Sequence, residues 1–164
     1  MTGIVATALI GFLHQYGFLA LFVYTVLEAS FLLHFAPVEF VVPVAAVVLV
    51  HDPISFVLFV GDTTLGTVIG SVGVYAVTDR FDEELTARLG PSNRFERTIG
   101  SWTRDWFDRF GEKSVLVGRC IPVVRVLISM PAGMAHMDRW RYIIYSTVGT
   151  SVFMTALVSL SLLA

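Results

Sequence analysis

The chain has 164 residues, of which 55% are hydrophobic and 15% are charged, and its mean hydropathy is +0.76. A soluble domain averages about 45–50% apolar and about 25% charged residues, so this composition excludes an ordinary soluble protein and indicates an integral membrane protein. The net charge is −2, and all eleven Lys and Arg residues lie between Arg80 and Arg141. The single Cys120 excludes an intramolecular disulfide and a metal site built from cysteines alone.

The first predicted element is a membrane-spanning helix from Ile4 to Leu27. This stretch carries no charge, and at 1.5 Å per residue it is long enough to cross a hydrocarbon core of about 30 Å. No basic residues precede the apolar run, which favours a retained helix over a cleaved signal peptide. Glu28 closes this helix.

A broken hairpin with acidic residues is predicted next, at residues 28–50. Two carboxylates and two prolines interrupt its apolar sequence, namely Glu28, Pro37, Glu39 and Pro43. The piece after Glu39 is too short to span a bilayer and has the length of a re-entrant segment.

A second spanning helix is predicted from Ile54 to Thr78, with Asp62 about a third of the way along it. Asp62 would cap, line a cavity or face water, and it is a candidate accessory residue. Gly66, Gly70 and Gly73 recur on one helical face, which allows another backbone to approach closely. Tight packing inside one chain explains this pattern as well as a homo-oligomer does.

The segment 79–112 is the one soluble-looking part of the chain. It is rich in basic residues, and short basic loops tend to remain cytoplasmic. Between Asn93 and Phe110 large apolar residues recur at steps of three and four, which predicts an amphipathic helix; they are Phe95, Ile99, Trp102, Trp106 and Phe110. This helix would lie on the membrane surface or pack on the protein itself, and the pattern fits both.

A second broken hairpin is predicted at residues 113–136, where Pro122 and Pro131 interrupt an apolar run that holds Arg119 and Arg125. Prolines make one continuous helix improbable there, because each removes a backbone donor. A charge at membrane depth costs about 2.5–3.5 kcal/mol on insertion scales, so such residues usually face a partner or a wet cavity. Broken backbone in a bilayer must also be buried in protein or line a cavity. The segment therefore predicts an anion site inside the membrane.

The chain ends with an interface anchor at residues 138–142 and a third span from Ile143 to Ala164. The predicted fold is an all-α integral membrane protein with three spanning helices, two re-entrant hairpins and a cytoplasmic amphipathic helix. It forms one domain, 1–164, whose halves 1–78 and 113–164 flank the loop 79–112. Two hairpins in corresponding positions indicate a transporter built from an inverted repeat.

Several motifs are spaced as in a known family of membrane proteins. They are Glu28; Ala36-Pro37-Val38-Glu39-Phe40 with Pro43; Gly61 with Gly66 and Tyr75; and Arg119-Cys120-Ile121-Pro122-Val123-Val124-Arg125 followed by Pro131-Ala132-Gly133 and Met137. With them, residues 17–149 resemble the DedA family, also called the VTT or SNARE-associated domain family. The resemblance implies transport of lipid-linked phosphates, proton or ion coupling at Glu28 and Glu39, and essential roles for Arg119 and Arg125. One departure is Val38, where the family usually has glycine.

The residues themselves favour phosphate binding by the two arginines, because a guanidinium presents a planar fork of donors that suits phosphate oxygens. The alternative is that Arg119 and Arg125 only neutralise Glu28 and Glu39 inside the fold. Glu28 also fits an interfacial residue at the end of the first span. Glu39 is the stronger candidate for coupling, since it lies between two prolines in apolar sequence.

The histidines and the single cysteine are weaker candidates for functional residues. The four histidines lack the spacing of metal ligands, and they are His14, His34, His51 and His136. Cys120 is expected to be a small packed residue rather than a reactive one. We therefore expect no metal, no cofactor and no catalytic residue.

The predicted function is a multi-pass plasma-membrane transporter or flippase of phosphate-bearing lipids, polyprenyl phosphate or phospholipid, with proton or ion coupling. Its expected partners are membrane lipids and not nucleic acid. Two alternatives stay open: a membrane-embedded enzyme acting on lipid phosphates, and an ion or proton transporter without a lipid substrate. The enzyme would need a nucleophile and a general acid or base, and no such motif is present in the sequence.

Overall fold

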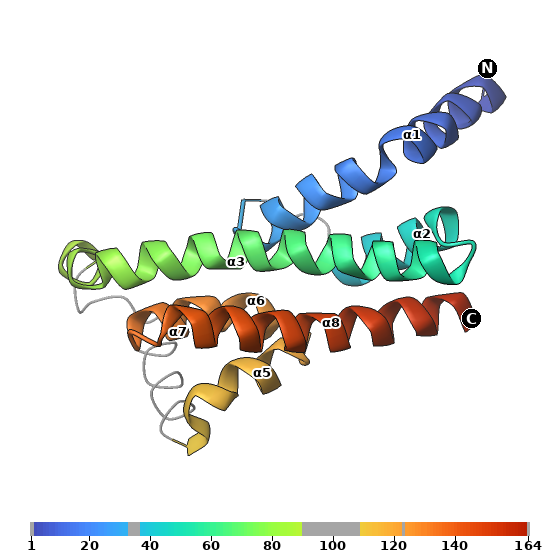
Figure 1. The fold of residues 1–164 in the computed structure, drawn as a ribbon. Helices are drawn as coiled ribbons and strands as arrows, with labels where there is room; N and C mark the ends of the chain where they lie inside the picture. The colour runs from blue at the N-terminus through green and yellow to red at the C-terminus, as the bar shows by residue number, and fades with distance from the viewer. Residues whose placement is uncertain (1, 33–36, 90–108, 123, 164) are drawn as a thin grey trace. The chain divides into compact units, whose positions relative to one another are not determined.

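The protein's structure, a computed structural model, describes residues 2–32, 37–89, 109–122 and 124–163 (Figure 1). All regular secondary structure in these ranges is helical, which confirms the all-α prediction. The helices are α1 (Thr2–Ala29), α2 (Val38–Leu49), α3 (Pro53–Leu89), the 3₁₀ helix η1 (Gly111–Lys113), α5 (Ser114–Arg119), α6 (Val124–Leu127), α7 (Ser129–Met134) and α8 (Arg139–Leu163).

Two of the described helices are long and apolar enough to cross a membrane, Pro53–Arg80 within α3 and Arg139–Leu163. They coincide with two of the three predicted spans. The third predicted span lies within α1, a helix of 28 residues. The part of α1 whose side chains are described, Tyr16–Ala29, is shorter than a span. The count of three spans therefore stays a prediction.

The helix that contains the second predicted span is longer than the span itself, because α3 continues to Leu89. Residues 79–89 are rich in charged residues and contain neither glycine nor proline. Such residues are compatible with a helix in water, so a helix that leaves the apolar layer has no local reason to stop. The predicted amphipathic helix and His34 lie largely or wholly outside the described residues.

The start of α3 is fixed by a reciprocal cap at Asp52, just before Pro53 in the first helical position. The N–H groups of Ile54 and Ser55 each donate to Asp52 Oδ1 at 2.9 Å. The N–H groups of His51 and Asp52 donate in return to Ser55 Oγ, each at 3.0 Å. The backbone hydrogen bond from Ser55 lowers the pKa of the exposed Asp52 carboxyl below its ordinary value.

This cap makes the start of α3 sensitive to acid. Because the pKa of Asp52 is lower in the folded protein, the carboxylate stabilises the helix start at neutral pH and loses this effect as the pH falls through the folded-state pKa. We expect Asp52→Ala to speed amide exchange at Ile54 and Ser55 at pH 7. Wild-type protein should approach the variant as the pH falls through the lowered pKa of Asp52. Hydrogen exchange measures this, and equal protection of the two proteins at pH 7 would contradict it.

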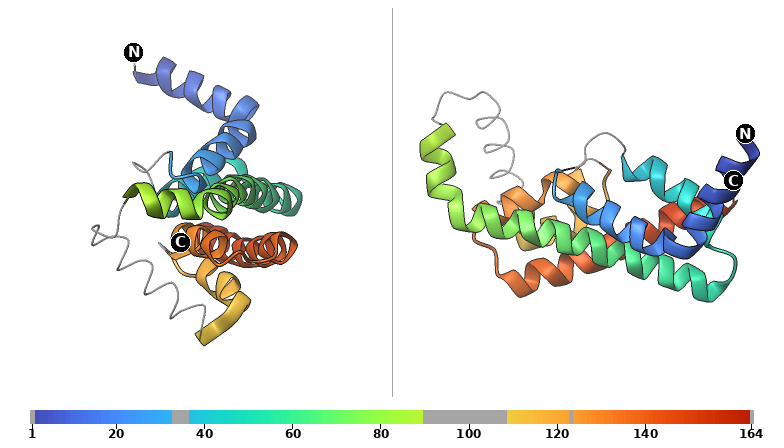
Figure 2. Two further views of the ribbon diagram at one scale, coloured as in Figure 1. Left: turned by 90° about the vertical axis from the view of Figure 1, so that its left-hand side faces the viewer. Right: turned by 90° about the horizontal axis from the view of Figure 1, so that it is seen from above.

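The chain divides into two compact units, residues 1–70 with 151–164 and residues 71–150. Unit 1 contains α2, which packs against α1 (Figure 2). One face of α2 is buried through Val38, Val42, Ala46 and Leu49 in the core of this unit. The spacing of four, four and three residues is that of a single helical face.

The opposite face of α2 is apolar as well, although it is not covered by protein. Phe40, Val44 and Val47 are all highly exposed. Large apolar side chains are exposed in the same way along α3 and α8, for example Ile54 and Leu160. A helix that is apolar all round suits a membrane interior, where its outer face meets lipid tails.

The acidic segment is broken between the end of α1 at Ala29 and the start of α2 at Val38. The backbone leaves α1 through a turn in which Phe31 has a φ of 61°, and Pro37 caps the start of α2. Pro43 lies inside α2, so the short piece predicted after Glu39 is one continuous helix of 12 residues. The helix continues because packing of its buried face offsets the one backbone hydrogen bond that proline removes.

Two glycines of α3 allow close contact with α1 inside unit 1. A Cβ added at Gly66 would lie 2.1 Å from Thr25 Oγ1, and one at Gly70 would lie 2.3 Å from the Val26 carbonyl oxygen. Gly73 was predicted to share this role, which is wrong: a Cβ there meets nothing among the described residues within 4 Å. Packing inside one chain thus accounts for Gly66 and Gly70, while a homo-oligomer stays a prediction.

Candidate anion site around the buried arginines

The segment that carries the two arginines is broken at Pro122, as predicted. α5 ends at Arg119, and a turn through Cys120 leads to α6, which begins at Val124. A second break follows at Ile128, between α6 and α7, and Pro131 lies in the first turn of α7. A proline is tolerated there, since the first N–H groups of a helix have no partner within the helix.

Arg119 is 1% exposed, and its guanidinium bridges segments that are distant in sequence. Nη1 donates to the backbone carbonyl of Arg125 at 2.9 Å. Nη2 donates to Ser129 Oγ at 3.2 Å and to the Tyr142 hydroxyl oxygen at 2.7 Å. The guanidinium carbon also lies 5.7 Å from the centre of the Tyr142 ring, within range of a cation–π contact. Arg119 thus ties α5 to α6, α7 and α8.

Tyr142 is fully buried, which corrects its prediction as an interface anchor. Its hydroxyl donates to the Ser71 carbonyl oxygen at 3.2 Å. Its ring stacks on Tyr75 with the ring centres 4.5 Å apart and 19° between the planes. Trp140, two residues earlier, is 73% exposed and does fit an anchor. Tyr142 is the site residue that the sequence reading missed.

Arg125 is 2% exposed, so both predicted arginines are buried in unit 2. Several hydroxyl side chains are buried in the same unit. The hydroxyl oxygens of Ser114 and Ser146 are buried without a hydrogen-bond partner in the described part of the chain. Guanidinium groups and spare hydroxyl donors are the groups that hold phosphate oxygens.

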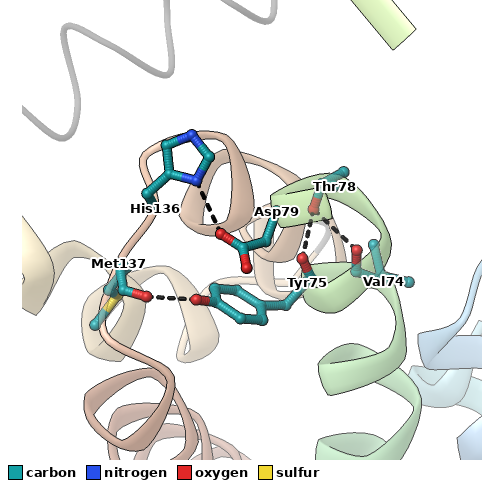
Figure 3. A network of polar contacts seen from close by, with 6 residues as sticks. All are labelled: Val74, Tyr75, Thr78, Asp79, His136 and Met137. Atoms are coloured by element: carbon teal, nitrogen blue, oxygen red, sulfur yellow. Dashed lines mark hydrogen bonds and ion pairs between the residues drawn. The ribbon is translucent and has the colours of Figure 1, made fainter. Parts of the chain in front are cut away.

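α3 and the loop before α8 meet in a second polar network of unit 2 (Figure 3). The Tyr75 hydroxyl donates to the Met137 carbonyl oxygen. His136 Nδ1 lies 2.9 Å from Asp79 Oδ1 at an exposed position. A Cβ added at Gly133 would lie 2.1 Å from Thr78 Oγ1, so only glycine lets α7 approach α3 this closely. This network anchors the stack on which Tyr142 rests.

The predicted coupling residues all lie in unit 1. Glu28 is 7% exposed, one residue before the end of α1. Glu39 is partly buried in the first turn of α2, where the helix dipole favours a carboxylate. Asp62 Oδ2 is buried and has no hydrogen-bond partner among the described residues. The predicted exchange of partners between these carboxylates and the arginines spans the two units and stays a prediction.

Cys120 is exposed, which corrects its prediction as a packed residue. It lies in the turn between α5 and α6, and its Sγ is 3.5 Å from the Leu116 carbonyl oxygen. Among the described residues, no three His, Cys, Asp or Glu side chains are grouped so that they could hold a metal ion.

Residues 36–162 match the family model of the VTT domain. The chain belongs to the VTT domain family. Undecaprenyl phosphate transporter A of Staphylococcus aureus is 29% identical over 159 residues, which cover 91% of this chain and 74% of that protein. Protein DedA of Escherichia coli is 26% identical over 85 residues, or 52% of this chain and 38% of that protein.

Another similar protein carries a different kind of name. An alkaline phosphatase-like protein of Lactococcus lactis is 28% identical over 129 residues, which cover 76% of this chain and 60% of that protein. This VTT domain therefore spans less than two thirds of some of its relatives. No solved structure matches the chain. The family match includes both buried arginines and the whole of α2, α3 and α5–α7.

Proposed function

We propose that this VTT domain protein moves phosphate-bearing lipids, a polyprenyl phosphate or a phospholipid, across the plasma membrane as a multi-pass transporter. The observation that carries the proposal is the burial of Arg119 and Arg125 at a helix break in an apolar chain. A buried cation is costly unless an anion or a set of acceptors compensates it, and intramembrane arginines usually mark a substrate path. The name of the S. aureus relative, a transporter of undecaprenyl phosphate, supports the same substrate class.

In this proposal the arginine segment and the acidic segment are two re-entrant hairpins of an inverted repeat. The basic loop 80–113 lies in the cytoplasm, because Lys and Arg are retained on that side. Arg119 and Arg125 together supply the positive charge for one phosphate. The lipid tail stays in the bilayer beside the protein, so the site needs to enclose only the headgroup.

Proton coupling follows from an exchange of partners. Glu39, with Glu28, compensates the arginines until a phosphate displaces the carboxylates. A released carboxylate then takes up a proton, because an uncompensated charge inside the membrane would cost several kcal/mol. Asp62 is an accessory proton acceptor in this scheme. Phosphate entry and proton uptake are thereby linked.

Glu39→Gln tests the coupling. The amide cannot take up a proton, so the variant should still bind lipid phosphate but lose the dependence of transport on an imposed pH gradient. Transport rates in proteoliposomes over a series of gradients measure this. Glu112→Gln is a control that removes a carboxylate from the exposed ion pair with Arg141. Normal pH dependence in Glu39→Gln would remove Glu39 from the coupling.

The name of the Lactococcus relative keeps a lipid-phosphate enzyme as the second candidate. One preparation of proteoliposomes distinguishes the two functions. A transporter moves a polyprenyl phosphate between leaflets and releases no inorganic phosphate. Release of inorganic phosphate at a rate that depends on the protein, without translocation, would instead establish the enzyme.

A further inference from the structure

The contacts of Arg119 restrict how it can bind an anion. A guanidinium grips phosphate bidentately through one of two edges, either Nη1 with Nη2 or Nε with Nη2. Both edges therefore need an N–H of Nη2. In this structure the two N–H groups of Nη2 are directed to Ser129 Oγ and to the Tyr142 hydroxyl, at 3.2 and 2.7 Å. Neither edge of Arg119 is open to a phosphate while these bonds persist.

The acceptor at Tyr142 is itself held in place. Its hydroxyl proton goes to the Ser71 carbonyl oxygen, which leaves a lone pair for Arg119. Stacking on Tyr75, whose own hydroxyl donates to the Met137 carbonyl, fixes the plane of the ring. A buried hydroxyl with both its roles assigned is a rigid anchor rather than an adaptable one.

The other end of Arg119 is fixed as well. A Cβ added at Gly149 would lie 2.6 Å from Arg119 Cβ, so α8 touches the root of the side chain there. Gly149 lies two helical turns after Tyr142 on the same face of α8. The Arg119 side chain is thus held against α8 at its root and at its guanidinium.

From these contacts we infer that Arg119 is a positioning residue and that Arg125 is the arginine that contacts the phosphate; this rests on the proposed function. Nη1 of Arg119 holds the backbone carbonyl of Arg125 at 2.9 Å, across the turn at Pro122. That bond ties the backbone of α6 at Arg125 to the side chain of Arg119 in α5. The Tyr142 hydroxyl, which has no contact with lipid phosphate in this scheme, is then required for full affinity.

The variant Tyr142→Phe distinguishes a positioning role of Arg119 from direct binding of phosphate by Arg119. The ring and its stack remain, but the acceptor for Nη2 is lost. If Arg119 positions Arg125, the Kd for a polyprenyl phosphate in nanodiscs should rise about tenfold, the effect of losing one hydrogen bond to a charged group. The KM for transport should rise in parallel, with little change in kcat. Tyr145→Phe, one turn further along α8, is the matched control and should bind as the wild type does.

The opposite result would overturn the inference. If Arg119 instead left Tyr142 to bind phosphate, loss of the hydroxyl would free Nη2, and Tyr142→Phe would bind equally well or more tightly. Ser129→Ala is the second variant and should weaken binding in the same direction. Melting temperatures of the variants show that each is folded.

A double-mutant cycle completes the test. In a protein that already carries Arg119→Lys, adding Tyr142→Phe should not raise the Kd for polyprenyl phosphate further, because the hydroxyl acts through Arg119. If the losses of binding affinity in the two single variants add in the double variant, the hydroxyl does not act through Arg119. Wild-type protein that binds neither polyprenyl phosphate nor inorganic phosphate would refute the proposed function instead. Displacement of the lipid by equimolar inorganic phosphate would assign the site to free phosphate, whereas displacement only at a large excess would assign it to the lipid headgroup.

Discussion

Arg125→Lys should reduce polyprenyl phosphate transport about a hundredfold although the positive charge is kept. A lysine is a point charge and cannot reproduce two parallel hydrogen bonds to phosphate oxygens. Charge-assisted bonds contribute about 1.5–3 kcal/mol each, and about 1.4 kcal/mol is a factor of ten. Initial rates of translocation in proteoliposomes measure the loss.

A matched arginine controls for the substitution itself. Arg139 is exposed in the first turn of α8, and Arg139→Lys should leave the rate unchanged. Both variants should show the wild-type melting temperature. Wild-type transport by Arg125→Lys would show that the site needs only charge, and the bidentate contact would be wrong.

Gly149→Ala should destabilise unit 2 and displace Arg119. The new Cβ would lie 2.6 Å from Arg119 Cβ and 2.9 Å from the Leu116 carbonyl oxygen. Overpacking of this kind costs about 1–3 kcal/mol, and here it would also push Arg119 off its acceptors. We expect a lower melting temperature together with a loss of transport.

Gly73→Ala is the control, because a Cβ there has nothing among the described residues within 4 Å. Alanine is the better helix former by about 0.5–1 kcal/mol, so this variant should be as stable as wild type or more so. Thermal unfolding in detergent compares the two variants. Equal melting temperatures and equal transport for Gly149→Ala and Gly73→Ala would contradict the close contact between α5 and α8.

Local sequence features predicted the elements well where one physical cause dominates. Long apolar runs predicted the helices that contain residues 54–78 and 143–163, since only length and hydropathy decide them. Pro122 marked a true break. Pro131 lies in the first turn of α7, just after the break at Ile128, whereas Pro43 lies inside the continuous helix α2. A proline's effect depends on its position within the helix and on packing, which the local sequence does not contain.

The arginines themselves were predictable, but their partners were not. Arg119 meets Ser129 and Tyr142 through bonds that close 10 and 23 residues of chain, and such pairings depend on tertiary packing. The sequence of α8 does contain a signal for this contact. Tyr142, Ser146, Gly149 and Thr150 fall on one face of an otherwise apolar helix, and all four are buried. A polar face in a membrane helix indicates a contact with protein rather than with lipid.

The role of the two arginines in transport is tested by the Arg119→Ala, Arg125→Ala double variant, through translocation of a polyprenyl phosphate in sealed proteoliposomes. The two buried arginines are proposed to provide all of the positive charge that takes the phosphate out of water. The double variant should therefore move the lipid no faster than protein-free liposomes, while reconstituting to the same level as wild type. Translocation by the double variant at the wild-type rate would show that the two arginines do not bind the phosphate during transport.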